Sequence, residues 1–201
     1  MVALAPVAGD AKPAKSASSV SVSDRALIDR AASYLSGLKT AQAKFSQTDP
    51  RGSVTTGLFS LQRPGRARFA YDPPADLTVV ADGTNVIAHD ARLKTFDQYP
   101  LKQTPLVMLL ADQVKLSDGA ANAAVSRRGA GFSVTLRDPK RQAQGSLTLD
   151  FSVSPVSLAG WTVVDAQGQR TTVRLSGLKS GVALEPNLFV LRDPKPRAFR
   201  P

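Results

Sequence analysis

The sequence predicts an α+β fold, in which one amphipathic helix precedes a long series of antiparallel strands. The clearest indication is the segment 57–71, where two runs with period-two alternation flank the turn Pro64-Gly65. Proline followed by glycine at the centre of a turn is typical of a type II turn. Helical segments are too few to serve as crossovers of a parallel sheet, so we expect an antiparallel sheet that curls and covers one face.

The helix is expected to begin near residues 21–24 and to end near Gly37. Apolar residues recur along it at helical spacing and form one stripe, which consists of Leu27, Ile28, Ala31, Leu35 and Leu38. Roughly eleven strands follow, separated by turns rich in Asp, Pro and Gly. We expect them at residues 41–48, 55–62, 66–71, 77–81, 85–90, 95–99, 123–128, 132–137, 144–151, 158–165 and 171–176.

A second, shorter helix is predicted over residues 104–110, with Thr104 as its cap and Pro105 at its first position. This helix is apolar on nearly every side, so it must be buried or must face an apolar partner. Residues 186–201 are rich in Pro and Arg, with a last strand or short helix at 188–191. Residues 1–20 are expected to be a disordered tail or the remnant of an export signal, and 21–201 to form a single domain.

The chain carries a net charge of +10, which favours an anionic partner such as a nucleic acid, an anionic membrane or an acidic protein. Aromatic residues make up only 6%, and most occupy core-type positions, which argues against nucleic-acid binding. The absence of cysteine excludes disulfides and thiolate sites. No apolar run approaches the roughly 20 residues that span a bilayer.

No constellation of catalytic residues is found in the sequence. The single histidine, His89, lacks the partners that a metal site or a catalytic triad requires. Nucleophile-elbow, Walker A and dinucleotide-binding glycine patterns do not occur, and most aspartates fall in turns. We therefore expect no enzymatic activity, no metal site and no cofactor.

Several short motifs follow one another in order between residues 24 and 165. They are Ala43-Lys44-Phe45-Ser46-Gln47, Gly57-x-Phe59-x-Leu61-x-Arg63-Pro64-Gly65, Arg68-Phe69-x-Tyr71, Val80-Ala81-Asp82-Gly83, Tyr99-Pro100-Leu101 and Thr104-Pro105-Leu106-x-x-Leu109-Leu110. In order and spacing they resemble the LolA family, the periplasmic carriers of bacterial lipoproteins. The last third of the chain resembles the family mainly in its strand pattern.

The resemblance implies an open, incomplete antiparallel β-barrel of about eleven strands, with helices forming a lid over the concave face. A hydrophobic cavity would shield the acyl chains of lipoproteins on their way from the inner to the outer membrane. The implied partners are acylated lipoproteins, an inner-membrane ABC-type lipoprotein exporter, and an outer-membrane acceptor or the membrane itself. The resemblance implies no cofactor.

The resemblance also implies roles for individual residues. Arg63 would act as a lid latch, because a guanidinium has five donors and can hold several helix carbonyls, here near Leu109 and Leu110. The candidates for the acyl-chain cavity and lid are Phe45, Leu58, Leu61, Phe69, Leu106, Met108, Leu109, Leu110, Leu149, Phe151 and Trp161. For each of the wall residues, a place in an ordinary core is an equal alternative.

Two features set the chain apart from the pattern of the family. Ala67 stands where family members usually carry a bulky aromatic residue, four positions after the motif arginine, and this smaller side chain would widen the mouth of the cavity. The basic charge leads to the hypothesis that the carrier touches anionic membrane during delivery. The alternative function is a half-barrel lipid-binding or envelope-sensing module that does not shuttle lipoproteins, since one fold serves several functions.

Overall fold

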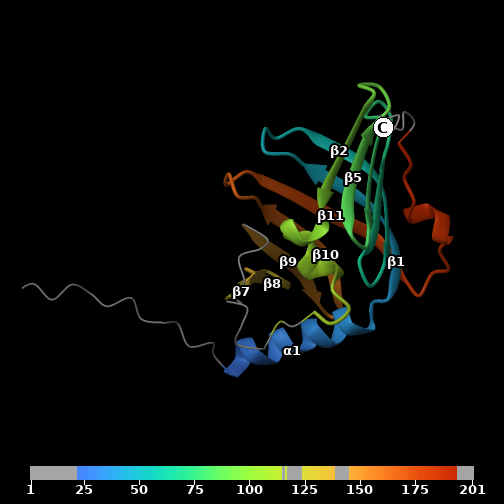
Figure 1. Cartoon of the computed structure of the whole chain (residues 1–201). Helices are drawn as coiled ribbons and strands as arrows, with labels where there is room; N and C mark the ends of the chain where they lie inside the picture. Colours follow the sequence, from blue (N-terminus) through green and yellow to red (C-terminus); the bar gives the residue numbers. More distant parts are fainter. Residues whose placement is uncertain (1–21, 115, 117–123, 139–144, 194–201) are drawn as a thin grey trace, which may run out of the picture.

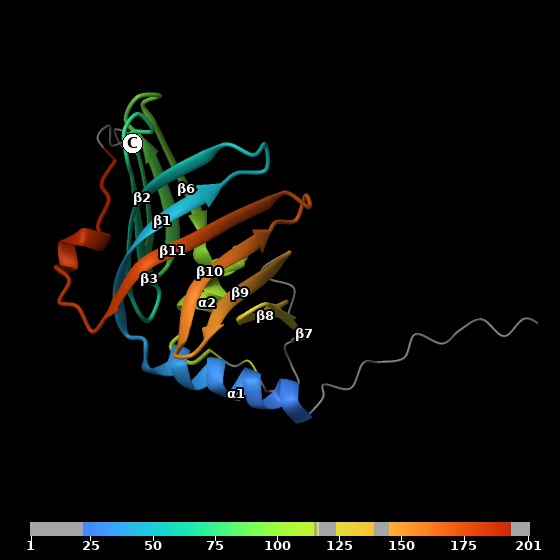
Figure 2. The ribbon, with the colours of Figure 1, turned by 180° about the vertical axis from the view of Figure 1, so that it is seen from behind.

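The computed structural model describes residues 22–114, 116, 124–138 and 145–193. Within these residues, all strands join one antiparallel sheet that curls around a short helix (Figures 1 and 2). The helices are α1 (Val22–Gly37), η1 (Leu101–Gln103), α2 (Leu106–Leu110) and η2 (Pro186–Phe189). The strands are β1 (Thr40–Thr48), β2 (Val54–Gln62), β3 (Arg66–Tyr71), β4 (Leu77–Asp82), β5 (Asn85–Asp90), β6 (Thr95–Pro100), β7 (Ala124–Arg128), β8 (Gly131–Leu136), β9 (Ser146–Val153), β10 (Val156–Val164) and β11 (Arg170–Ser180).

The strand order is β6-β5-β4-β3-β2-β1-β11-β10-β9-β8-β7, so every neighbouring pair is sequential except β1 and β11. These two strands pair antiparallel in the middle of the sheet, while β6 and β7 form its two edges. The sheet is open, and β6 and β7, which follow each other in the chain, lie at its opposite edges. α2 belongs to the segment between β6 and β7 and lies on the concave side (Figure 1).

The predicted fold class and the N-terminal helix are confirmed. Ile28, Ala31 and Leu35 of α1 and Leu38, which follows the helix, are no more than 3% exposed. The helix packs at one end of the curled sheet, against β10 and β7 (Figure 2). Arg30 donates to the carbonyl of Val153 across 2.9 Å and fixes the helix to the β9–β10 turn. None of the helices in the described ranges has the length and apolar character needed to cross a bilayer.

The two faces of the sheet differ because successive side chains of a strand point to opposite sides. On the concave side, Phe45 of β1 lies opposite Gly57 of β2. A Cβ at Gly57 would lie 2.8 Å from the Phe45 ring and closer still to the carbonyl of Ala70, so only glycine lets these strands and the ring approach each other. On the outer side, η2 covers β3 and β4 and buries Phe189, Val80 and Ile87.

One local prediction is wrong, and another is decided between its two alternatives. Thr104 does not cap α2: its Oγ1 donates to the carbonyl of Leu101 at 2.9 Å, because η1 ends just before it, and Pro105 takes the N-cap position. Of the two alternatives for residues 188–191, a last strand or a short helix, the structure has the helix, as the 3-10 helix Pro186–Phe189. Residues 1–20 lie outside the described part of the chain, so the expected tail and domain boundary stay predictions.

Candidate functional site

A group of aromatic rings covers the concave side of the central strands. Phe45, Phe59, Phe69 and Trp161 come from β1, β2, β3 and β10, and none is more than 7% exposed. The ring centres of Phe59 and Phe69 lie 4.9 Å apart, and those of Phe59 and Trp161 lie 5.2 Å apart. The strand register places Phe59 directly opposite Phe69, which explains why these rings meet.

A pocket of about 800 Å³ lies between two of these rings, Phe69 and Trp161, and the beginning of α2. Its apolar lining includes Phe69, Tyr71, Val79, Leu106, Trp161, Val163 and Val173, and its polar lining includes Gln47, Gln103, Thr104, Asp165, Gln167 and Thr171. The Tyr71 hydroxyl donates to Oε1 of Gln47 at 2.8 Å, and burial raises the pKa of the Tyr71 phenol to about 12. The phenol is therefore neutral at physiological pH and satisfies its hydrogen bond inside the pocket wall.

α2 packs against the concave face with most of its surface. Leu109 and Leu110 are at most 2% exposed and belong to the main core, while Leu106, Val107 and Met108 are partly buried against it. Five consecutive apolar residues thus find apolar surroundings on several sides. A helix this short has little intrinsic stability, so its position depends on packing and on the bonds at its ends.

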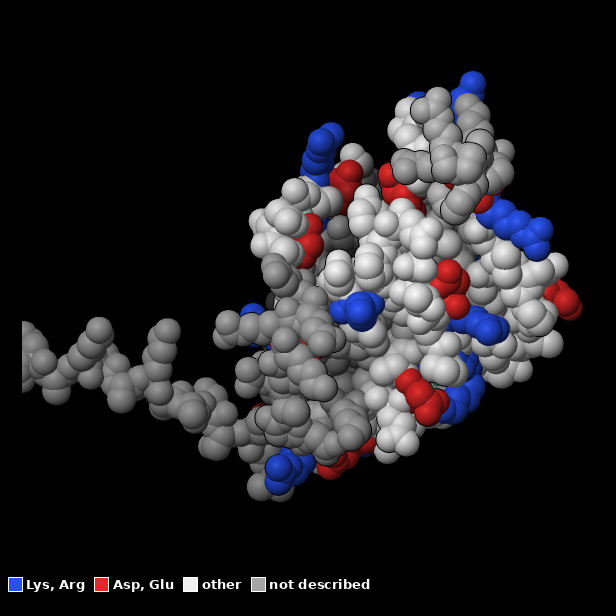
Figure 3. Space-filling view, in the orientation of Figure 1, with Lys and Arg blue, Asp and Glu red and all other residues white. Residues whose placement is uncertain are grey.

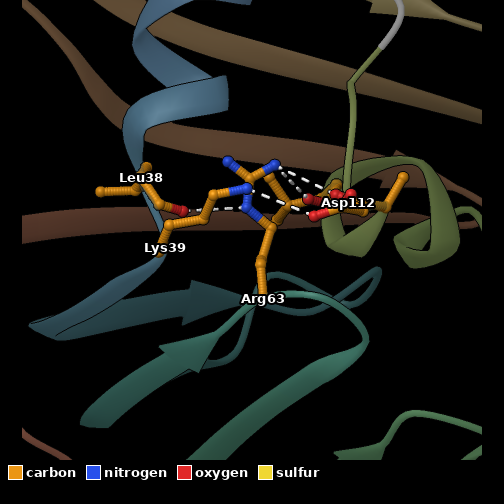
Figure 4. Close-up of polar contacts among 6 residues, drawn as sticks. Leu38, Lys39, Arg63 and Asp112 are labelled. Carbon is orange, nitrogen blue, oxygen red and sulfur yellow. Dashed lines mark hydrogen bonds and ion pairs between the residues drawn. The ribbon is translucent and has the colours of Figure 1, made fainter.

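Arg63 holds the end of α2, and its side chain is only 6% exposed (Figure 4). Nε donates to the carbonyl of Leu38, just after α1, at 3.0 Å. Nη1 donates to the carbonyls of Leu109 and Ala111 at 3.4 and 3.3 Å. One guanidinium therefore joins the carboxyl ends of both α-helices, where unpaired carbonyls and the helix dipole favour a cation.

The backbone of the β2–β3 turn adds a second bond to the same helix end. The N–H of Gly65 donates to the carbonyl of Leu110 at 2.8 Å, so the carbonyls of residues 109, 110 and 111 are all bound by this turn. Gly65 has a φ of +78°, which glycine adopts without the strain that other residues would suffer. The turn Arg63-Pro64-Gly65 thus acts as a clamp on α2.

The charge of Arg63 is only partly compensated. Burial lowers the pKa of the guanidinium, Asp112 opposes this effect, and Nη2 has no hydrogen-bond partner among the described residues. The Asp112 carboxylate itself bonds to Nζ of Lys39 at 3.2 Å on the exposed side, an ion pair that contributes little. The carbonyls of Leu38, Leu109 and Ala111 therefore compensate the burial of the guanidinium only in part.

Comparison with known proteins decides the family. The sequence profile of the family described as "Outer membrane lipoprotein carrier protein LolA" matches residues 36–192. The chain belongs to the LolA family. A relative from Pseudomonas fluorescens strain Pf0-1, named outer-membrane lipoprotein carrier protein, is 31% identical over 179 residues, which cover 84% of this chain and 85% of the relative.

Two further comparisons extend this family assignment. The Pseudomonas aeruginosa PAO1 protein of the same name is 29% identical over 191 residues and covers 90% of both chains. Among solved structures, an uncharacterized conserved protein from Thermus thermophilus superimposes with a TM-score of 0.51 at 12% identity, over 86% of this chain and 96% of that chain. Because its sequence identity is so low, the Thermus thermophilus structure shows likeness of fold alone.

In this LolA-family chain, most of the predicted site residues lie on the concave side. The residues buried in its core are Phe45, Leu61, Phe69, Leu109, Leu110, Leu149, Phe151 and Trp161. Of the predicted residues, Phe69, Leu106 and Trp161 line the pocket. Phe151 lies farther away, where its ring stacks on Phe132 at 5.2 Å and meets Tyr34 of α1.

The prediction for Leu58 is wrong. This side chain is 42% exposed and lies on the outer face, because its neighbours Gly57 and Phe59 face inward and side chains alternate along a strand. The prediction also left out Phe59, which is 1% exposed at the centre of the aromatic cluster. The alternation Gly57-x-Phe59-x-Leu61 was the signal that separates these residues from Leu58.

Proposed function

We propose that this protein is a periplasmic carrier that shields the acyl chains of lipoproteins between the inner and the outer membrane. Membership of the LolA family and the names of the relatives support the lipoprotein cargo. The observation that carries the proposal is the apolar helix α2, clamped by Arg63 over an aromatic concave face next to a pocket.

The energetics of acyl chains explain why such an arrangement suits a carrier. Each methylene transferred from water to an apolar site contributes about 0.8 kcal/mol, so a shielded chain is strongly stabilised. Tight burial alone would prevent delivery. When α2 moves away, cargo methylenes replace Leu109 and Leu110 against the rings, while the hydrogen bonds of Arg63 are lost. Re-forming these bonds favours release.

The free energies of the hydrogen bonds and of the buried methylenes are compatible with an exchange of α2 for cargo. A hydrogen bond to a charged group contributes about 1.5–3 kcal/mol, which a few buried methylenes offset. Ala67, 2% exposed in the core opposite Leu61 and Ala81, fills less of the concave side than an aromatic side chain would. The exporter that loads the carrier and the outer-membrane acceptor, or the membrane itself, complete the proposed route. No covalent chemistry is part of it.

The test is the release of acylated lipoproteins from spheroplasts into the soluble fraction. Release in a complex with the added protein is expected, and the variant Arg63→Leu should change the yield or retention of cargo. Arg51→Leu, which replaces an exposed arginine of the β1–β2 turn, is the matched control. A folded protein that binds an apolar dye yet releases no lipoprotein would instead favour the lipid-binding or sensing module.

A further inference from the structure

The central strands of the sheet carry charge of one sign only. The charged residues of β1, β2, β3, β10 and β11 are Lys44, Arg66, Arg68, Arg170, Arg174 and Lys179, and these strands contain no Asp or Glu. By contrast, the outlying strands β4, β5, β6 and β9 each carry an aspartate. The five neighbouring central strands thus carry six positive charges and no negative one.

The register places all these cations on the outer face. Lys44 lies opposite Leu58 and Ser176, while its neighbour Phe45 points to the core. The cross-strand row formed by Lys179, Gln42, Ser60 and Arg68 lies on the same side. Arg174 pairs with Ser46, and Arg170 is two residues from Thr172, which pairs with Thr48, so both share this face.

Arg68 is not available to an external partner, because its Nη1 donates to the carbonyl of Leu188 and holds η2 over β3. The remaining five residues are exposed and form what we call the outer cationic face: Lys44, Arg66, Arg170, Arg174 and Lys179. In the described part of the chain, none of the five forms an ion pair. Asp82 lies opposite Arg66 but accepts the backbone N–H groups of Thr84 and Asn85.

The dimensions of this face follow from strand geometry. Three strand spacings separate β3 from β11, about 15 Å, and the nine-residue step from Arg170 to Lys179 spans about 30 Å. Two large apolar side chains of β2 are exposed within this area, Leu58 at 42% beside Lys44 and Val54 at 62% opposite Thr48. The face seen in Figure 3 is different, because cations and anions lie there side by side among uncharged residues.

The chemistry of the outer cationic face selects one kind of occupant. The aromatic residues of these five strands, Phe45, Phe59, Phe69, Tyr71 and Trp161, belong to or pack against the concave core. The face therefore lacks the rings on which nucleic-acid bases stack and the aromatic anchors of protein interfaces. Long, unpaired Lys and Arg side chains around Leu58 and Val54 instead suit a fluid layer of anionic headgroups, which needs no complementary shape.

We propose that the outer cationic face binds the surface of an anionic lipid bilayer. The contact lies on the side of the sheet opposite the pocket and α2, so the protein can rest on a membrane while its concave side stays accessible. The interaction is electrostatic, and it weakens as salt shortens the Debye length.

The experiment is co-sedimentation of the full chain with vesicles of phosphatidylcholine, alone or mixed with phosphatidylglycerol, at low and high salt. We expect salt-sensitive binding to the mixed vesicles only. The triple variant Lys44→Gln, Arg174→Gln, Lys179→Gln should bind on the order of 100-fold more weakly. The control Arg25→Gln, Arg92→Gln, Lys102→Gln removes the same charge from exposed sites outside these strands and should retain most of the binding.

Equal binding to both kinds of vesicle, or an equal loss in the two triple variants, would overturn the proposal. Equally tight binding of double-stranded DNA or polyglutamate, with the same loss in the first variant, would overturn it as well and point to a general polyanion surface. Thermal unfolding of both variants checks that they fold. The lipoprotein-release test is independent, since the triple variant leaves Arg63 and the pocket lining unchanged.

Discussion

The backbone N–H of Gly65 lies 2.8 Å from the carbonyl oxygen of Leu110, so the β2–β3 turn and α2 are joined without any side chain. Arg63 adds bonds to the carbonyls on either side, at residues 109 and 111. Because the Gly65 bond uses backbone atoms alone, a substitution of Arg63 removes the side-chain part of the clamp, and its contribution can be measured.

Replacing Arg63 by lysine should lower the free energy of unfolding by about 1–3 kcal/mol, since an ammonium cannot reach the carbonyls of Leu38, Leu109 and Ala111 together. Urea unfolding measures this loss, and hydrogen exchange should show faster opening of residues 106–111. The exposed substitution Arg51→Lys is the control. Equal stability of the two variants would contradict a structural clamp.

Leu58 and Leu61 lie three residues apart on one strand but face opposite sides. Leu61→Ala should cost about 2–5 kcal/mol, because the side chain is fully buried and leaves a cavity. Leu58→Ala should cost less than about 1 kcal/mol at its exposed position. Urea unfolding of the two variants compares these losses directly, and similar values would contradict the assignment of the two faces.

The raised pKa of Tyr71 predicts that the free energy of unfolding depends on pH in the alkaline range. Its phenol has a pKa of about 12 in the folded state against about 10 when unfolded, so the folded state keeps a proton that the unfolded state loses between these values. Stability should therefore fall as the pH rises from about 10 to 12, by up to about 2–3 kcal/mol, with no such effect below pH 10. Tyr71→Phe should reduce this slope in unfolding curves, while an unchanged slope would rule out Tyr71 as its source.

Trp161 offers a probe of the pocket, since it is the single tryptophan and lines the pocket beside Leu106. A fatty acid that carries bromine on its acyl chain should quench Trp161 fluorescence at saturable concentrations, whereas free bromide should not reach this buried ring. Leu106→Asp should weaken the quenching, because a charge in the pocket must be desolvated. Leu93→Asp, at a 62% exposed turn position, should leave it unchanged. Quenching that neither variant affects would place the acyl chain elsewhere.

Local patterns in the sequence were sufficient for the elements and for the sides that most residues face. Period-two alternation and the turns rich in Asp, Pro and Gly predicted the strands, and the stripe of Ile28, Ala31 and Leu35 predicted α1. The same alternation separates Leu58 from Phe59, so that error came from neglecting strand parity. The role of Thr104 was harder to predict, since a threonine before a proline serves equally well as a helix cap or as a donor to the preceding turn.

The sequence by itself determined the series of strands, the apolar character of α2 and the chemical type of Arg63, because backbone periodicity and side-chain chemistry act over a few residues. Only the tertiary structure decided that β1 pairs with β11, that α2 lies on the concave side of the sheet, and that Arg63 meets the carbonyls of Leu38, Leu109 and Ala111. It also gathered the cations of β1, β3 and β11 on one face. These contacts join residues far apart in the chain, so they depend on which surfaces the whole fold buries together.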